Sequence, residues 1–220
     1  MILVPVKNLA TAKQRLAAAL DQAARTELAQ AMLHDVVSAL AAWTGRPACA
    51  LVTSDSFALE LARQYDFEII PDPANPGETG AIEMATQVCV ERGVDSTIVI
   101  PADIPLIQAS ELELILEHAP EKGSVLAPAA DGRGTNAAFR RPANLFPLRF
   151  GNDSFKPHLA AAQATGKPCV VLQLPTVAID VDNPEDLQRL LAYRGETHSQ
   201  SLLRKWMLEG RFLAKGSEVS

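Results

Sequence analysis

The chain has 220 residues, 48% of them hydrophobic and 21% charged, and its formal net charge is −6. This size and composition suit one globular domain with a small appendage, and the negative charge argues against a protein that binds nucleic acid through bulk positive charge. The sequence has no apolar run of about 18 residues and no charged leader with a cleavage site, so we expect neither a membrane span nor a secretory signal.

Strands and helices alternate along the chain. The expected order begins with strand 1–6, helices 10–20 and 22–42, strand 49–53, helix 56–65, strand 67–70, helix 79–92, strand 97–100, helix 110–118 and strand 124–128. It continues with an extended piece at 137–140, helix 153–165, strands 168–174 and 177–181, and a last helix that Asn183 caps and Pro184 opens. Ser110 and Glu113 have the spacing of a capping box at the start of helix 110–118. The alternation indicates an α/β fold with a mainly parallel sheet, and the short strands after residue 135 indicate an antiparallel insertion.

The predicted domain ends where this pattern ends. Residues 1–194 form the domain, and residues 195–220 form a polar C-terminal tail. The stretch LLRKWMLEGRF in the tail either forms a helical arm for packing or dimerisation or is loosely held.

The three cysteines indicate a reducing compartment. Cys49, Cys89 and Cys169 are widely spaced and odd in number, which fits neither a disulfide framework nor a zinc site. We therefore expect buried free thiols and a cytoplasmic location.

A single carboxylate interrupts the apolar segment TIVIPADIPLI. Asp103 follows predicted strand 97–100, and the ligand crevice of a parallel sheet lies at the carboxyl ends of its strands. Pro101 can stop the strand, and Pro105 disfavours helix at the residue before it, so the exit is stiff and extended. Asp103 either faces the ligand crevice or forms an Asx turn before Pro105, and its position alone does not decide between the two.

A second acidic pair ends predicted strand 177–181. In an extended chain Asp180 and Asp182 point to the same side, and carboxylates that close repel each other unless a cation lies between them. Oxygen ligands select a hard ion such as Mg²⁺ or Mn²⁺. Asp182 has the alternative of capping the helix that begins at Pro184, but Asp180 has no such role, so the pattern favours a metal site.

Two glycine-containing loops have the composition of anion sites. In DGRGTNA, turned backbone N–H groups, the charge of Arg133 and the hydroxyl of Thr135 are candidate anion ligands. In FGNDSFKPH, Gly151 and Ser154 stand at a predicted helix start, where free N–H groups favour anions. His158 lies one turn beyond Ser154 and is either a ligand contact or a residue of the helix surface.

Three cations, Lys7, Lys13 and Arg15, cluster where the first strand passes into a helix. Their charges suit a polyphosphate. A solvated helix face is the ordinary alternative, but the segment directly follows a buried strand, which favours the phosphate interpretation.

Five motifs occur in an order typical of one enzyme family. PVKNLATAKQRLA, ADIPLI, DGRGTNA, FGNDSFKPHLAAA and DVDNPEDL together span about residues 3–192. In this combination the chain resembles the CofC/FbiD family of phospholactate-type guanylyltransferases, which contribute to the deazaflavin coenzyme F420. The resemblance implies a single-domain nucleotidyltransferase fold of the GT-A or MobA-like type, a Rossmann-like three-layer sandwich similar to the molybdenum-cofactor guanylyltransferases.

The resemblance also implies a reaction. GTP condenses with 2-phospho-L-lactate, phosphoenolpyruvate or 3-phospho-D-glycerate to give a guanosine diphosphate adduct and pyrophosphate. A downstream transferase then moves the phospho-acyl unit onto the deazaflavin precursor. We expect no nucleic-acid or membrane partner and either a monomer or a homodimer.

Site residues are carried over by motif. The residues expected to bind Mg²⁺ or Mn²⁺ are Asp103, Asp180 and Asp182. The residues expected to hold the carboxylate of the phospho-acid are Thr135, Gly151 and Ser154. The residues expected near the nucleotide phosphates are Lys7, Lys13 and Arg15, and the expected catalytic residues are Lys13 and Asp103.

The chain departs from the family pattern in two places. Gly-Asp-Leu-Pro of the family is Ala102-Asp-Ile-Pro105 here, which is a small change. Leu-Asn-x-Ala of the family is replaced in the segment that begins at Gly77 and reads GETGAIE. We hypothesise that Glu78 accepts hydrogen bonds from N1–H and the amino group of guanine, and that Thr79 caps the helix.

In the expected mechanism a phosphate oxygen of the acid attacks the α-phosphorus of GTP in line, so no protein nucleophile is needed. Two other functions remain open at this point. One is a different metal-dependent nucleotidyltransferase or a GT-A glycosyltransferase, and the other is a non-catalytic nucleotide-sensing module with residues 195–220 as its partner arm.

Overall fold

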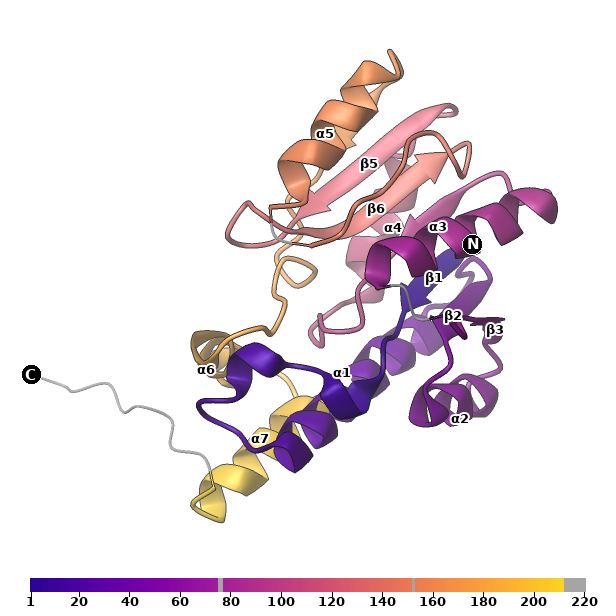
Figure 1. Cartoon of the computed structure of the whole chain (residues 1–220). Helices are drawn as coiled ribbons and strands as arrows, with labels where there is room; N and C mark the ends of the chain where they lie inside the picture. The colour runs from indigo at the N-terminus through magenta and orange to yellow at the C-terminus, as the bar shows by residue number, and fades with distance from the viewer. Residues whose placement is uncertain (75–76, 152, 212–220) are drawn as a thin grey trace, which may run out of the picture.

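A seven-stranded sheet lies at the centre of the part of the chain that the computed structural model describes, namely residues 1–74, 77–151 and 153–211 (Figure 1). The strands are β1 (Ile2–Pro5), β2 (Cys49–Thr53), β3 (Glu68–Pro71), β4 (Thr97–Val99), β5 (Gly123–Pro128), β6 (Thr135–Arg141) and β7 (Cys169–Val171). Their spatial order is β3-β2-β1-β4-β6-β5-β7, and β6 runs antiparallel to β4 and β5 while the other pairs are parallel. The structure confirms the expected α/β fold, a mostly parallel sheet with an antiparallel insertion.

Helices cover both faces of this sheet (Figure 1). They are α1 (Gln22–Ala42), α2 (Ser56–Gln64), α3 (Glu78–Glu91), α4 (Ala109–Glu117), α5 (Phe155–Ala164), α6 (Pro184–Ala192) and α7 (His198–Leu208), with two 3₁₀ turns, η1 (Leu9–Thr11) and η2 (Gln14–Leu16). Helices α1, α2 and α4 pack on one face, and α3 and α5 pack on the other. Strand β1 shows the reason, because Ile2 and Val4 are buried in the first core and Leu3 in the second. These three layers form the expected sandwich.

The C-terminal helices α6 and α7 form a third core against α1. Trp206 of α7 is fully buried in this cluster. The N-terminus of α7 is also held by Asp35 of α1, whose carboxylate accepts the backbone N–H of His198 at 2.6 Å and that of Ser199 at 3.0 Å. Residues 198–208 are therefore a helix docked on the domain, and the end of the predicted tail lies outside the described residues.

The predicted helix over 10–20 is wrong. Lys13 separates the turns η1 and η2, and its φ of 56° and ψ of 43° place it in the left-handed region. A right-handed helix cannot pass through that conformation. The predicted capping box at Ser110 is also wrong, because α4 has Gln108 at its N-cap position and no side-chain cap there.

Residues 177–181 do not form the predicted strand. The buried carboxylate of Glu111 accepts the backbone N–H of Thr176 at 3.0 Å and that of Val177 at 2.9 Å. The N–H of Ala178 turns back to the carbonyl oxygen of Leu174 at 2.8 Å. These donors are used by a distant carboxylate and by a local turn, so they cannot join a neighbouring strand.

Cys49, Cys89 and Cys169 are free thiols, as predicted, but only Cys49 and Cys89 are buried and Cys169 is partly exposed. Across the described ranges, the helices are too short or too polar to cross a membrane.

Candidate active site

A cavity of about 670 Å³ opens at the edge of the sheet where β1 and β4 end and β6 begins. Parallel strands bring their carboxyl ends to one edge, and the antiparallel β6 brings its first residue to the same edge. Every predicted site residue except Thr79 lines this cavity. The lining residues among them are Lys7, Lys13, Arg15, Glu78, Asp103, Thr135, Gly151, Ser154, Asp180 and Asp182.

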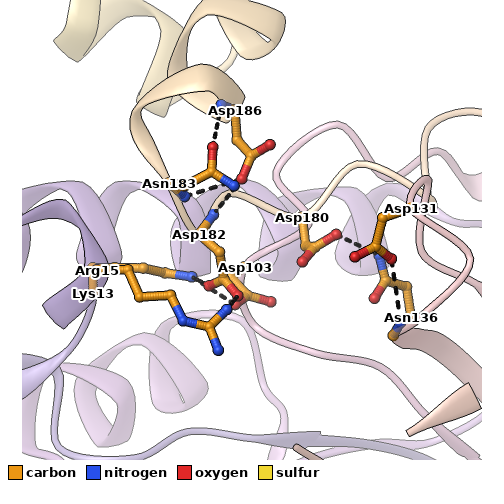
Figure 2. A network of polar contacts seen from close by, with 10 residues as sticks. Lys13, Arg15, Asp103, Asp131, Asn136, Asp180, Asp182, Asn183 and Asp186 are labelled. Carbon is orange, nitrogen blue, oxygen red and sulfur yellow. Dashed lines mark hydrogen bonds and ion pairs between the residues drawn. The ribbon is translucent and has the colours of Figure 1, made fainter. Parts of the chain in front are cut away.

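Lys13 joins two of the predicted carboxylates (Figure 2). Its Nζ donates to Asp103 Oδ2 at 2.6 Å and to Asp182 Oδ1 at 3.0 Å, and its side chain is only 8% exposed. Burial lowers the pKa of Lys13, but the charges of Asp103 and Asp182 outweigh burial and raise it, so the ammonium stays protonated. Arg15 Nη1 donates to the other oxygen of Asp182 at 3.1 Å.

Lys13 makes these ion pairs from a left-handed backbone conformation. Such a conformation costs a residue with a side chain on the order of 1 kcal/mol or more, and it is common at functional sites. Lys13 is bound to partners 90 and 169 positions away along the chain. The left-handed residue therefore carries an ammonium that lies in the cavity beside carboxylates of distant segments.

Asp180 and Asp182 have different partners, because the strand that was expected to align them is absent. Asn136 Nδ2 donates to Asp180 Oδ1 at 3.2 Å, on the side of Asp180 away from Lys13 (Figure 2). Burial and, after it, the charge of Asp103 raise the pKa of Asp180 to about 6. Burial also raises the pKa of Asp182, but Lys13 and then Arg15 outweigh burial and lower it.

The structure does not support the alternative roles of Asp103 in an Asx turn and of Asp182 as a helix cap. Helix α6 is capped by Asn183, and Asp186 Oδ2 accepts the backbone N–H groups of Asp182 and Asn183, each at 3.0 Å. The side chain of Asp182 is therefore free of the cap and binds the cations of the cavity. The carboxylate of Asp103 likewise faces Lys13 in the cavity.

The three carboxylates are the residues that could hold a divalent cation. Across residues 1–74, 77–151 and 153–211, no group of three or more His, Cys, Asp or Glu side chains is arranged as a ready metal site. Lys13 lies between two of the carboxylates, and Asn136 binds the third. Asn136 had no predicted role, although it lies in the DGRGTNA motif next to Thr135.

Hydroxyl groups and backbone turns form another part of the cavity lining. Thr135 and Ser154 are both buried, and their hydroxyl oxygens lie 3.4 Å apart. Gly151 has a φ of 139°, which favours glycine. Helix α5 begins at Phe155, two residues later than predicted, and the Phe155 N–H donates to the carbonyl oxygen of Arg133 at 2.8 Å.

Arg133 is not a free cation for an anion. Its Nη2 donates to Asp153 Oδ2 at 3.1 Å, and both side chains are exposed. This pair joins the two anion loops at the mouth of the cavity. His158 is neither a ligand contact nor a surface residue, because it is 1% exposed and does not line the cavity.

Glu78 is the first residue of α3 and lines the cavity. Burial and, after it, the charge of Asp103 raise the pKa of Glu78 to about 7, although Lys7 and Lys13 oppose this shift. Thr79 does not cap α3, whose N-cap residue is Gly77. Its hydroxyl instead donates to the carbonyl oxygen of Phe150 at 3.2 Å and so ties α3 to a cavity loop.

Known proteins resemble this chain over nearly its whole length. The family described as "Guanylyl transferase CofC like" matches residues 1–218. The phosphoenolpyruvate guanylyltransferase of Sphaerobacter thermophilus is 35% identical over 190 residues, which cover 86% of this chain and 91% of that protein. The 2-phospho-L-lactate guanylyltransferase of Methanothermobacter thermautotrophicus is 34% identical over 218 residues, which cover 99% of this chain and 94% of that protein.

The fold also has a solved counterpart. A crystal structure described as a nucleotide-diphospho-sugar transferase from Desulfovibrio desulfuricans superposes with a TM-score of 0.74 over 94% of both chains. Its sequence is 19% identical, so this likeness establishes a shared fold.

Proposed function

The chain belongs to the CofC-like guanylyl transferase family, and we propose that it joins GTP to a three-carbon phospho-acid with release of pyrophosphate. The acid is 2-phospho-L-lactate, phosphoenolpyruvate or 3-phospho-D-glycerate, and the product is a guanosine diphosphate adduct. One observation carries the proposal. The cation pair of Lys13 and Arg15 and the hydroxyl pair of Thr135 and Ser154 line the same cavity, so two anionic substrates can meet there.

Each side of the cavity is assigned to one substrate. The Thr135 hydroxyl and the backbone N–H groups of Gly151 and Ser154 hold the carboxylate of the phospho-acid. The cations assigned to the phosphates of GTP are Lys7, Lys13 and Arg15. Glu78 accepts hydrogen bonds from the guanine edge, and Thr79 supports it indirectly by holding the start of α3 against the loop of Phe150.

For the metal we propose that Asp103, Asp180 and Asp182 bind Mg²⁺ or Mn²⁺. Their oxygen atoms suit a hard divalent cation. The raised pKa of Asp180 supports this assignment, because a carboxylate crowded by burial and by Asp103 is stabilised in its ionised form by a nearby cation. When bound, the ion would supply positive charge to the reacting phosphates.

The residues of the chain act by alignment and charge. The attacking oxygen belongs to the phosphate of the acid, which is already anionic at neutral pH. A bond forms between this oxygen and the α-phosphorus of GTP, and the bond from the α-phosphorus to the β-phosphate oxygen breaks, with its electron pair leaving on pyrophosphate. Lys13, which is buried and charged before the substrates arrive and is held at the cavity by Asp103 and Asp182, stabilises negative charge on the phosphates.

We further propose that the enzyme acts in the cytoplasm as a monomer or homodimer and supplies a transferase of coenzyme F420 biosynthesis. The three free thiols support a reducing compartment. The product links a phosphate of the acid to GMP as an anhydride, so the next enzyme must transfer the phospho-acyl unit and release GMP.

The test is pyrophosphate release on mixing the protein with Mg²⁺, one nucleotide and one phospho-acid, in every combination of four nucleotides and the three acids. The proposal expects release with GTP and at least one acid, and mass spectrometry should detect the adduct. A glycosyltransferase would instead release a nucleoside phosphate from a nucleotide sugar. Binding of GTP without release would indicate a sensing module, and either result would overturn the proposal.

A further inference from the structure

His158 uses both of its ring nitrogens inside the protein. The residue lies in α5 and is 1% exposed. Its Nε2 accepts the backbone N–H of Arg149 at 2.7 Å, and its Nδ1 lies 2.9 Å from the hydroxyl oxygen of Thr135. The imidazole thus connects a backbone amide of segment 142–151 to a hydroxyl that lines the cavity.

The first of these contacts fixes the tautomer of the ring. A nitrogen that accepts an N–H hydrogen bond carries no proton, so a neutral imidazole must carry its proton on Nδ1. Burial and, after it, the charge of Arg140 lower the pKa of His158 to about 4, so the ring is neutral near pH 7. The Nδ1–H group therefore donates to Thr135 Oγ1.

The tautomer in turn fixes the direction of the Thr135 hydroxyl. The oxygen of Thr135 accepts from His158 at 2.9 Å and from the Ser154 hydroxyl at 3.4 Å. A hydroxyl has one proton and two lone pairs, and both lone pairs are then occupied. The remaining proton of Thr135 is left to point into the cavity that this residue lines.

The opposite arrangement would be unfavourable for an anionic ligand. If Nδ1 carried no proton, the Thr135 hydroxyl would donate to it and present a lone pair to the cavity. A carboxylate or phosphate oxygen would then meet a lone pair instead of a donor. The ring also packs edge-on against Phe150, another lining residue, with ring centroids 5.2 Å apart.

We propose that His158 is a positioning residue that holds the Thr135 hydroxyl as a donor to the phospho-acid. This role rests on the proposed function. His158 touches no substrate, and its effect reaches the ligand through Thr135.

A pair of substitutions separates this role from simple packing. In His158→Asn the side-chain amide can occupy the position of Nδ1 and donate to Thr135, while the contact with Arg149 is lost. In His158→Gln the longer side chain can accept from Arg149 at the position of Nε2, while the donor to Thr135 is lost. We expect His158→Gln to raise KM for the phospho-acid roughly 10- to 100-fold with little change in KM for GTP. His158→Asn should retain KM within about threefold of the wild-type value.

Thr135→Val gives the upper limit of the effect, and the double variant Thr135→Val/His158→Gln should be no worse than Thr135→Val alone. Equal KM values in the Asn and Gln variants, or additive losses in the double variant, would overturn the role of His158 but leave the proposed function standing. Absence of wild-type turnover with any phospho-acid would overturn both.

Long-range ¹⁵N–¹H correlation spectra of the wild-type protein provide a test that needs no variant to fold. They should show the His158 ring protonated at Nδ1 and unprotonated at Nε2. A ring protonated at Nε2 would overturn the inference whatever the kinetics.

Discussion

Asp180→Asn should stabilise the free protein while removing its activity. The pKa of Asp180 is raised from 3.8 to about 6, which corresponds to about 3 kcal/mol in favour of the protonated form. Asparagine keeps an oxygen that can accept from Asn136 and carries no charge to bury. Because solvent screens part of the effect, we expect a gain of about 1–3 kcal/mol in the free energy of unfolding at pH 7.

The sign of this stability difference follows from the pH range in which the folded and the unfolded protein each bind the proton of Asp180. Well below pH 4 Asp180 is protonated in both the folded and the unfolded protein, so wild type and variant have similar stability. Between about pH 4 and pH 6 Asp180 is ionised in the unfolded chain but keeps its proton in the folded protein. The wild type therefore loses stability relative to the variant in this range. Well above pH 6 Asp180 is ionised in both states and the difference is constant.

Urea unfolding from pH 4 to pH 8 in the presence of EDTA measures this difference directly. Asp153→Asn is the matched control, because Asp153 is exposed and paired with Arg133, and its loss should bring no gain in stability. Millimolar Mg²⁺ should stabilise the wild type and not Asp180→Asn. Equal stability of wild type and variant across this pH range would refute the electrostatic reasoning, and equal stabilisation of both by Mg²⁺ would refute the metal assignment.

Lys13→Met should lower kcat/KM roughly 100- to 1,000-fold in the pyrophosphate assay and lower the free energy of unfolding by about 1–3 kcal/mol, because it leaves Asp103 and Asp182 without their shared cation. Glu78→Gln should raise KM for GTP about tenfold and reduce the preference for GTP over ATP. In the wild-type enzyme KM for GTP should fall as pH rises through about 7, because Glu78 ionises in this range. Asp35→Ala should lower the free energy of unfolding by about 2–4 kcal/mol, because its carboxylate accepts two backbone N–H groups at the start of α7, and circular dichroism during urea unfolding should record the loss. Unchanged activity, unchanged base preference and unchanged stability, respectively, would contradict these three expectations.

The sequence predicted the cavity better than it predicted the elements around it. Asp103 follows β4 and Lys7 follows β1, and parallel strands end at one edge of the sheet, so the position of these residues could be predicted. Asp180 and Asp182 line the same cavity although the predicted strand before them is absent. The length of α1 was also predicted correctly from its apolar spacing.

The errors have a common cause, which is a partner distant in sequence. The strand at 177–181 is absent because Glu111, about 65 positions earlier, binds the backbone donors of that segment. The helix at 10–20 is broken at Lys13, which has a left-handed backbone and whose side chain binds Asp103 and Asp182 on distant segments. Local propensity carries no information about either contact. His158 was misjudged for the same reason, because its two partners, Thr135 and the backbone of Arg149, lie on other segments.

The charges of the cavity connect its stability with its proposed chemistry. Three carboxylates share two cations, because Lys13 forms ion pairs with Asp103 and Asp182 and Arg15 forms an ion pair with Asp182. Asp180 receives a neutral amide donor, and its ionised form therefore destabilises the folded protein near neutral pH. The same uncompensated charge favours a divalent cation, whose binding would return the lost stability by mass action. A substitution that relieves the charge without a ligand therefore removes the attraction for the ligand, so stability gained at Asp180 should be accompanied by a loss of activity.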